Sequence, residues 1–331
     1  MGVRPGAPLS GRRALVTGIA GQDGSYLAEL LLDRGYEVAG VVRADPAAPY
    51  PNLDAVRDRI ELVQADLLDE QALRGALRRH APQEVYNLAS PSFVPRSWEH
   101  PVETAEFAAV GVTSLLEAVR AVDPAIRVYQ ASSSEIFGEP ADVPQTESTP
   151  LAPVTPYGVA KAYGHLIVHS YRRRYGLHAS CGILYNHESP RRPVDFVPSK
   201  IAAGAALVSL GREQELLLGD LDAERDWGYA GDYVEAMWLM LQQDEPGDYV
   251  IASGELHTVG DLAERAFAHV GLDWREHVRV DETLLRGRAE LHRLVGDPAK
   301  ARTVLGWSPR VGFGELVRLL VDAAVARLTT P

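Results

Sequence analysis

The residues best suited to chemistry are a tyrosine and a lysine four positions apart, Tyr157 and Lys161. The segment Pro156–Lys161 is expected to open a helix, with proline in the first turn, where its missing N–H is tolerated. Residues four apart share one helix face, so the ammonium and the phenol can reach the same ligand. A phenol is a poor base at neutral pH, and a nearby cation favours its phenolate. The pair therefore predicts removal of an alcohol proton while a hydride leaves the same carbon.

Hydroxyl groups and a carboxyl group end a predicted strand upstream of this pair. Ser132, Ser133 and Ser134 alone are explained by a polar loop with local capping. Glu135 is different, because at the carboxyl end of a central strand it would face a ligand cleft, where it could exchange protons with a substrate. We expect four catalytic residues, namely Ser133, Glu135, Tyr157 and Lys161.

A glycine-rich turn follows the first predicted strand. Its three glycines are spaced three apart and lead directly into a predicted helix. Glycine permits the tight turn and lets the backbone approach a pyrophosphate at the start of the helix. The strand-turn-helix setting predicts a dinucleotide site. The residues of this turn expected to contact the cofactor are Gly18, Gly21, Gln22, Asp23 and Gly24.

The end of the second predicted strand bears on the choice of cofactor. Arg43 stands where an acidic residue would accept hydrogen bonds from an adenosine ribose. A cation there suits a 2′-phosphate, so NADP is favoured over NAD. NAD stays possible, because Asp45 could take the acidic role if its loop folds back. We also expect Asp66, Leu67 and Leu88, at the ends of the next two strands, to contact the cofactor.

The order of predicted elements indicates an α/β fold, because short apolar strands alternate with amphipathic helices. The predicted strands are 14–18, 37–43, 60–67, 84–90, 127–134 and 179–185. The predicted helices include 25–34, 71–79, 104–122, 197–210, 232–243, 259–270 and 313–328. This pattern predicts a Rossmann-type, doubly wound parallel sheet with a smaller C-terminal substrate-binding lobe. We place the NADP-binding domain at 1–185, with about 229–254 returning to it, and the substrate lobe mainly at 186–331.

Composition excludes several other classes of protein. The chain of 331 residues carries a net charge of −12, and its one dense basic run, 172–174, lies late in a predicted helix, so we expect no nucleic-acid partner. No apolar stretch is long enough to span a membrane, and no signal peptide is evident, so we expect a cytoplasmic protein. The one cysteine, Cys181, is expected to pack in the core. The ten histidines are scattered without ligand spacing, so no metal site is expected.

Longer segments carry a resemblance that runs from about residue 13 to about residue 328. They are Gly18–Gly24, Tyr129–Gly138, Gly182–Arg192, and Arg225–Gly228 followed by Gly231–Trp238. In these segments the chain resembles the GDP-mannose 4,6-dehydratase family. The resemblance implies a tightly held NADP, a GDP-linked sugar as substrate, a place in deoxysugar biosynthesis, and assembly as a homodimer or homotetramer.

The resemblance also implies a role for individual residues. Tyr157 would be the base at the sugar C4 hydroxyl, Lys161 would hold the nicotinamide ribose, and Glu135 would be the acid-base carboxylate. Ser133 stands where the family usually has threonine and would hydrogen-bond the C4 oxygen. His187 would lie near the nicotinamide. The residues expected to bind the nucleotide-sugar are Ser92, Glu135, Asn186, Lys200, Arg225 and Arg288.

The implied reaction is a lyase reaction in three linked steps. C4 is oxidised by NADP⁺, Glu135 removes the C5 proton as the C6 hydroxyl leaves as water, and hydride returns to C6. The product would be GDP-4-keto-6-deoxymannose. The first alternative is a nucleotide-sugar epimerase, which oxidises C4 in the same way but returns hydride to C4. The second is a catalytically silent nucleotide-binding or redox-sensing protein, which would be free to lose the Tyr157–Lys161 pair.

Overall fold

The computed structural model describes residues 11–284 and 293–329. The chain divides into two compact units, which are described separately below. The first consists of the described residues of Met1–Ile136, Thr155–Ile183 and Val234–Tyr249. The second consists of the described residues of Phe137–Val154, Leu184–Tyr233 and Val250–Pro331. This division puts Phe137–Val154 in the second unit, although it lies within the range 1–185 expected for the first domain.

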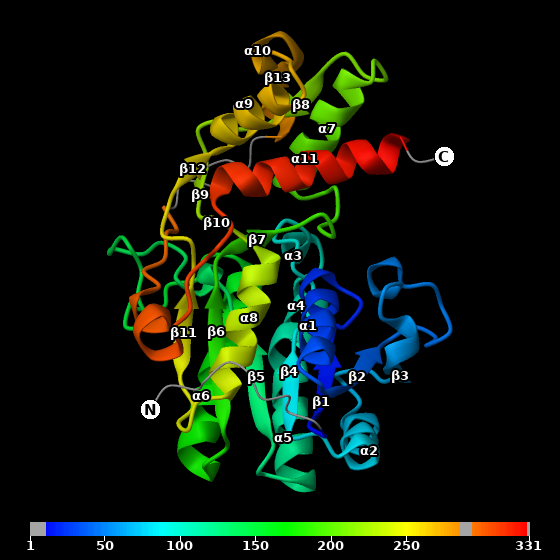
Figure 1. The fold of residues 1–331 in the computed structure, drawn as a ribbon. Helices are drawn as coiled ribbons and strands as arrows, with labels where there is room; N and C mark the ends of the chain where they lie inside the picture. Colours follow the sequence, from blue (N-terminus) through cyan, green and yellow to red (C-terminus); the bar gives the residue numbers. More distant parts are fainter. Residues whose placement is uncertain (1–10, 285–292, 330–331) are drawn as a thin grey trace. The chain divides into compact units, whose positions relative to one another are not determined.

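A seven-stranded sheet forms the centre of the first unit, in the order β11-β6-β5-β4-β1-β2-β3 (Figure 1). Neighbouring strands from β6 to β3 pair in parallel. The order reverses direction between β1 and β4, which is the switch point where such sheets bind ligands. The predicted doubly wound Rossmann-type sheet is therefore confirmed. Its strands are β1 (Arg13–Thr17), β2 (Glu37–Val42), β3 (Ile60–Gln64), β4 (Glu84–Asn87), β5 (Arg127–Ala131), β6 (Ala179–Leu184) and β11 (Asp248–Ile251).

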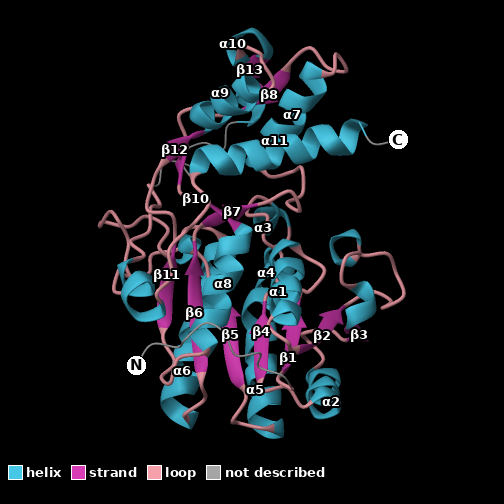
Figure 2. Ribbon diagram, viewed as in Figure 1, coloured by secondary structure: helices cyan, strands magenta, loops and turns pink. Residues whose placement is uncertain are grey.

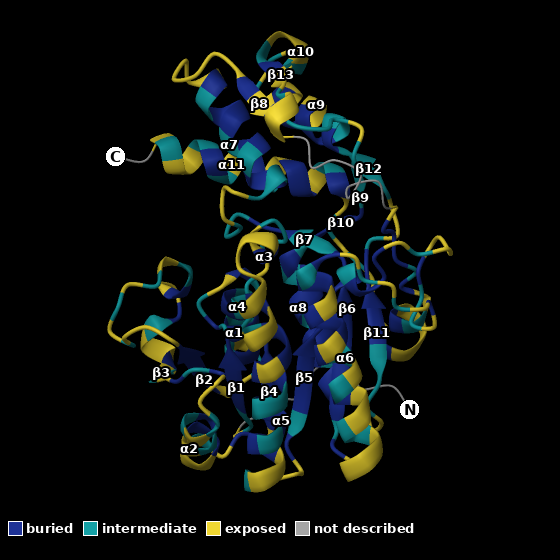
Figure 3. Ribbon diagram, turned by 180° about the vertical axis from the view of Figure 1, so that it is seen from behind, coloured by how far each residue is buried: buried dark blue, intermediate teal, exposed yellow. Residues whose placement is uncertain are grey.

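Helices cover both faces of this sheet (Figure 2). On one face α2 (Glu70–His80), α5 (Gly111–Val122) and α6 (Pro156–Tyr175) bury apolar side chains with the strands in a single cluster. The other face carries α1 (Gln22–Asp33) and α8 (Ala230–Leu241), which are joined by an ion pair between Arg34 and Glu235. Figure 3 shows the central strands mostly dark blue, with yellow on the outward parts of the covering helices. Because both faces are covered, β1, β2, β5 and β6 are buried along most of their length, whereas the edge strand β3 is only partly buried.

The helix predicted over 104–122 is interrupted. It consists of α4 (Pro101–Ala105), one wider π turn at Glu106–Val110, and α5. A π turn inserts an extra residue without breaking the helix path, and periodicity alone does not reveal it. Phe107, in this turn, lines the cavity described below. The short α3 (Arg96–Glu99) precedes α4 and was not predicted.

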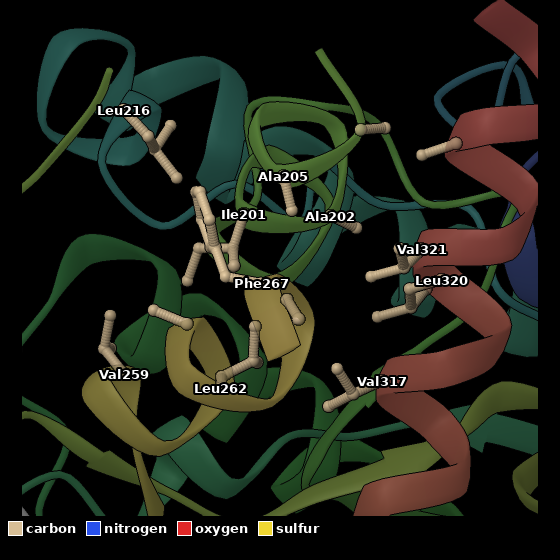
Figure 4. Close-up of a cluster of buried hydrophobic side chains, with 14 of the residues drawn as sticks. Ile201, Ala202, Ala205, Leu216, Val259, Leu262, Phe267, Val317, Leu320 and Val321 are labelled. Carbon is tan, nitrogen blue, oxygen red and sulfur yellow. The ribbon is translucent and has the colours of Figure 1, made fainter. Parts of the chain in front are cut away.

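The second unit is built on three helices that share an apolar core (Figure 4). They are α7 (Val197–Ser209), α9 (Val259–His269) and α11 (Phe313–Thr329). Ile201, Phe267 and Val321 are fully buried at their meeting point. Thr258 and Asp261 form a reciprocal capping box that starts α9 after the loop.

The described part of the second unit also contains three small two-stranded sheets. They pair β7 (Asn186–Glu188) with β10 (Trp227–Tyr229), β9 (Glu224–Arg225) with β12 (His257–Thr258), and β8 (Leu216–Leu218) with β13 (Val278–Val280). A short α10 (Trp274–His277) precedes β13. Among the helices described, none is both long and apolar enough to cross a membrane.

Candidate active site

The glycine-rich turn lies at the switch point of the sheet, between β1 and α1. Gly18 has a φ of 68°, and a Cβ added there would lie 2.8 Å from the Ala89 backbone nitrogen. A Cβ on Gly24 would collide with the Gly18 carbonyl oxygen and with the Ile19 backbone. Gly21 is the N-cap of α1, and no side chain caps the first turn of that helix. The turn therefore requires glycine and leads directly into the N-terminus of a helix, where anionic groups bind favourably.

A cavity of about 460 Å³ opens beside this turn within the first unit. It contains four residues that the sequence analysis assigned to the cofactor, namely Gly18, Gly21, Arg43 and Leu67. Its wall also includes Tyr50, Arg96 and Phe107, which sequence reasoning missed. Tyr50 lies in a loop, Arg96 in the short α3 and Phe107 in the π turn, and no local sequence pattern in these segments indicates a ligand contact.

Arg43 and Asp45 take different positions at this cavity. The Arg43 guanidinium lies 4.7 Å from the centroid of the Phe107 ring, and both residues line the cavity. The Asp45 carboxylate instead accepts the Ala47 amide at 2.8 Å, in a local turn. Asp45 is not among the described residues that line the cavity. The geometry thus places a cation, rather than an acid, at the end of β2.

The remaining predicted cofactor residues lie around the turn. The Gln22 side-chain amide donates from Nε2 to the Asp23 carboxylate at 3.1 Å. Asp66 accepts the Leu68 amide, which closes the loop after β3. The Leu88 amide donates to the Thr17 hydroxyl at 3.2 Å, just after β4. Ser92 is exposed and follows Pro91, which lies in the cavity wall.

Tyr157 and Lys161 lie one turn apart in α6. The Thr155 hydroxyl caps this helix by accepting the Gly158 amide at 2.9 Å, and Pro156 occupies its first turn. Both functional side chains are buried in the first unit, and the Lys161 ammonium lies 5.6 Å from the centroid of the Tyr157 ring. The ammonium donates to the Ala131 carbonyl oxygen at 3.1 Å. Burial lowers the pKa of Lys161 to about 8, and the charge of Asp23 opposes that shift.

Ser133 and Glu135 follow β5 in the same unit. The Glu135 amide donates to the Ser133 hydroxyl at 3.2 Å, in a short helical turn at Ser134–Ile136. This turn packs against α6. Ser133 is buried, and Glu135 is half-buried. The end of β5 and the start of α6 therefore bring the four predicted catalytic residues to one end of the first unit.

Three predicted ligand residues lie in or beside the small sheets of the second unit. Asn186 pairs with Trp227 in the β7–β10 sheet, and His187 follows in β7. The His187 Nδ1 donates to the Tyr185 carbonyl oxygen at 2.7 Å, and the ring stacks on Tyr233, with ring centroids 4.7 Å apart. Because the carbonyl only accepts, Nδ1 carries the proton in this contact. Arg225 lies in β9, two residues before Trp227.

Asp226 anchors the segment that carries Arg225. Its buried carboxylate accepts the Ser253 hydroxyl at 2.6 Å and the amides of Ser253, Gly254 and Gly296. Burial raises the pKa of Asp226, and these hydrogen bonds oppose the rise. Lys200 lies in α7 and is half-buried. Arg288 lies outside the residues that the structure describes.

A second group of potential ligands lies elsewhere in the first unit, where His165, Cys181 and Asp248 come within 4.8 Å of one another. Arg172 donates to both carboxylate oxygens of Asp248, at 2.7 and 3.3 Å. A cation would have to displace this guanidinium before it could bind. Burial raises the pKa of the Cys181 thiol well above its ordinary value, so the thiol holds its proton. Cys181 packs in the core, as the sequence predicted.

Comparison with known proteins adds an independent finding. A sequence model described as GDP-mannose 4,6 dehydratase matches residues 15–320. The chain is 47% identical over 321 residues to GDP-mannose 4,6 dehydratase 1 of Arabidopsis thaliana, covering 93% of this chain and 88% of the relative. It is 44% identical over 344 residues to the GDP-mannose 4,6 dehydratase of Homo sapiens, covering 96% and 92%. The chain belongs to the GDP-mannose 4,6-dehydratase family.

Solved structures place the family within a wider fold group. A UDP-glucose 4-epimerase from Thermus thermophilus in complex with NAD has a TM-score of 0.83 and 30% identity, covering 96% of this chain and all of that one (100%). A dTDP-glucose 4,6-dehydratase from Streptomyces venezuelae with NAD bound also has a TM-score of 0.83, with 26% identity, covering 96% and 97%. Epimerases and dehydratases therefore share this fold, and the fold alone does not separate their reactions.

Proposed function

We propose that this chain is a nucleotide-sugar 4,6-dehydratase that converts GDP-mannose to GDP-4-keto-6-deoxymannose. The observation that carries the proposal is the grouping of Tyr157, Lys161, Ser133 and Glu135 at one end of the first unit, beside the glycine-rich turn. Its family membership supports the choice of substrate, because relatives 44–47% identical over most of the chain are named for GDP-mannose.

A nicotinamide dinucleotide suits the first unit. The glycines at positions 18 and 24 leave no room for side chains, which lets a pyrophosphate approach the start of α1. The adjacent cavity has room for an adenosine, with Arg43 and Arg96 in its wall. A bound nicotinamide would supply the acceptor for hydride from C4 and the donor of hydride to C6.

The side chains of this protein would move the protons. Tyr157 takes the proton of the C4 hydroxyl, and the Lys161 ammonium stabilises the phenolate form that makes this possible. The C4 ketone that results acidifies the C5 proton. Glu135 removes that proton and donates it to the departing C6 hydroxyl, which leaves as water. Ser133 hydrogen-bonds the C4 oxygen throughout. As C6 is reduced, C5 takes a proton from solvent, and this balances the C4 hydroxyl proton, which Tyr157 releases.

The proposed roles in the second unit concern the nucleotide-sugar. Lys200 and Arg225 would contact its diphosphate, since charge-assisted hydrogen bonds suit phosphate oxygens. Asn186 would bind the same ligand, while His187 would approach the nicotinamide. The buried Asp226 carboxylate supports Arg225 by tying its segment to three backbone amides. Ser92 and Arg288 stay predictions from the sequence.

The test of the proposed function is incubation of the purified protein with GDP-mannose, followed by mass spectrometry. We expect a product lighter than the substrate by one water. An isomer of unchanged mass with inverted C4 would favour the epimerase instead. Absence of any product from GDP-mannose, with turnover of another nucleotide-sugar, would overturn the choice of substrate.

NADP is the proposed cofactor in preference to NAD. Arg43 lines the cavity at the end of β2, and the Asp45 carboxylate is bound within its own loop. Arg96 adds a second cation to the wall, although it also pairs with Glu103 at 3.2 Å. We expect Arg43→Gln to weaken NADP⁺ binding about tenfold or more and to change NAD⁺ binding little. Equal losses for both cofactors, measured by calorimetry, would contradict this assignment.

A homodimer or homotetramer is the proposed assembly. Three apolar side chains of α6 are exposed in the single chain, namely Val159, Tyr163 and Leu166. Placed at spacings of four and three, they form one stripe on the helix, which a second copy of this chain could cover. Light scattering should give at least twice the monomer mass, and Leu166→Glu should lower it. A monomer at micromolar concentration would contradict the proposed assembly.

A further inference from the structure

A continuous line of hydrogen bonds crosses the ends of three central strands in the first unit. The Thr17 hydroxyl donates to Asn87 Oδ1 at 2.6 Å, and Asn87 Nδ2 donates to Gln130 Oε1 at 2.7 Å. Gln130 Nε2 then donates to the Ala131 carbonyl oxygen at 2.9 Å. Lys161 Nζ donates to that same oxygen at 3.1 Å. We call these groups the strand-end relay.

The register of the sheet produces the relay. Thr17 lies directly opposite Asn87 in the β1–β4 pair, and Asn87 lies directly opposite Gln130 in the β4–β5 pair. Thr17, Asn87 and Gln130 are each at most 5% exposed. Buried amide and hydroxyl groups need partners, and each of these groups finds one on the neighbouring strand. The relay therefore joins the strand before the glycine-rich turn to the strand before Glu135.

The two ends of the relay fix its direction. At one end the Thr17 oxygen accepts the backbone amides of Leu88 and Ala89, both at 3.2 Å, so its proton is directed to Asn87. At the other end the Ala131 carbonyl has no proton, so Gln130 must present its NH₂ group. Each side chain thus has one orientation that satisfies all partners. Chains of hydrogen bonds aligned in this way strengthen one another.

The relay ends on the group that holds the lysine ammonium. A carbonyl oxygen has two lone pairs, and Ala131 uses one for Gln130 and one for Lys161. The position of this carbonyl therefore sets the position of the ammonium beside Tyr157. We propose that Gln130, held by Asn87 and Thr17, is a positioning residue that fixes the Ala131 carbonyl and through it Lys161. This role rests on the proposed function in one respect only, namely that the Lys161 ammonium stabilises the phenolate of Tyr157.

The charge of Lys161 offers a direct readout of this role. Burial lowers the pKa of Lys161 to about 8, and a hydrogen bond from the ammonium to a fixed carbonyl favours the charged form. In Gln130→Met the carbonyl loses its fixed partner, so the pKa of Lys161 should fall by about one unit. In Gln130→Glu an acidic oxygen replaces the NH₂ group close to the ammonium, so the pKa should rise. A merely structural role does not predict opposite shifts.

The experiment is a ¹³C NMR titration of protein grown on lysine labelled at Cε. The chain has three lysines, Lys161, Lys200 and Lys300, so the signals are few, and Lys161→Met identifies the one required. The matched control is Ser180→Ala, which removes a buried hydroxyl from the neighbouring β6, where it accepts the Gly247 amide at 3.2 Å. We expect the Lys161 midpoint to fall in Gln130→Met, to rise in Gln130→Glu and to stay in place in Ser180→Ala.

The outcomes separate this proposal from the proposed function. The titration needs no substrate, so it reports on the relay even if GDP-mannose is not turned over. If Gln130→Met does not fold, as judged by its thermal melt, Gln130→Leu takes its place, because the test needs a neutral variant beside Gln130→Glu. A Lys161 midpoint that does not move in the Gln130 variants that fold would overturn the proposal, and so would an equal shift in Ser180→Ala. As a second readout, the acid limb of the kcat pH profile should move in the Gln130 variants and not in Ser180→Ala.

Discussion

Replacing Lys161 by methionine should stabilise the cofactor-free protein at pH 7. Lys161 is 6% exposed, and its pKa falls from an ordinary 10.5 to about 8, so its charge is costly in the folded state. At about 1.4 kcal/mol per unit, a difference of roughly 2.5 units corresponds to about 3 kcal/mol. Methionine has a similar length, and the Ala131 carbonyl keeps its bond to Gln130. Allowing about 1 kcal/mol for the lost lysine hydrogen bond leaves a gain of about 2 kcal/mol.

The pH dependence of this gain gives the sharper test. Below the pKa that Lys161 has in the folded protein, its amine is protonated in both the folded and the unfolded state. The buried charge then lowers the stability of the folded protein by its full amount. Between the folded and the unfolded pKa the unfolded chain holds more protons, so the stability of the wild-type protein rises with pH. The advantage of Lys161→Met should therefore shrink by about 2 kcal/mol between about pH 7 and about pH 9.5.

Urea unfolding followed by circular dichroism at the two pH values measures both quantities. The control is Lys161→Arg, which keeps a charge that does not titrate in this range and should give no gain. The reasoning fails if Lys161→Met is no more stable than the wild-type protein at pH 7. It also fails if its advantage is the same at both pH values. A confirmed gain would mean that the fold accepts a buried cation at a cost in stability because the chemistry needs it.

Three further predictions concern the site. Glu135→Gln should retain cofactor and GDP-mannose binding by calorimetry yet lose dehydration at least about a hundredfold, since only proton transfer is removed; unchanged turnover would count against its role. Tyr157→Phe should abolish the first oxidation, seen as the missing absorbance of reduced nicotinamide in a single turnover; a normal burst would refute the assignment. Gly24→Ala should prevent dinucleotide binding, because its Cβ meets the Gly18 carbonyl oxygen, and retained binding in a folded variant would contradict the turn's role.

Much of the fold follows from local pattern. The sixth strand, predicted at 179–185, is β6 (Ala179–Leu184), and the last helix, predicted at 313–328, is α11 (Phe313–Thr329). Buried parallel strands are continuous apolar runs, and the helices carry a periodic apolar stripe, so both are visible in the residues. In contrast, β11 (Asp248–Ile251) is four residues long and joins the sheet beside β6 through pairing distant in sequence. The return of about 229–254 to the first domain was expected, but no strand was predicted there, and the position of β11 beside β6 could not be predicted from its own residues.

The residues of the candidate site likewise fall into those that local spacing predicts and those that depend on contacts distant in sequence. Gly18, Tyr157 and Lys161 were predicted because their spacing carries a local constraint, either a tight turn or a shared helix face. Gln130 lies in Tyr129–Gly138, one of the segments that carry the family resemblance. Its role was not predicted, because it depends on lying opposite Asn87 in a sheet register that no local pattern specifies. Arg96 was missed for a similar reason, because it reaches the cavity wall from a short helix after β4.

The most direct test of the proposed dehydration follows the hydrogen that leaves C4. The protein is incubated with GDP-mannose deuterated at C4, and the product is analysed by mass spectrometry and NMR. The proposal predicts a product lighter by one water that carries the deuterium at C6, because hydride from C4 returns to C6 within one active site. A product of unchanged formula with deuterium still at C4, or a dehydrated product without deuterium at C6, would contradict it.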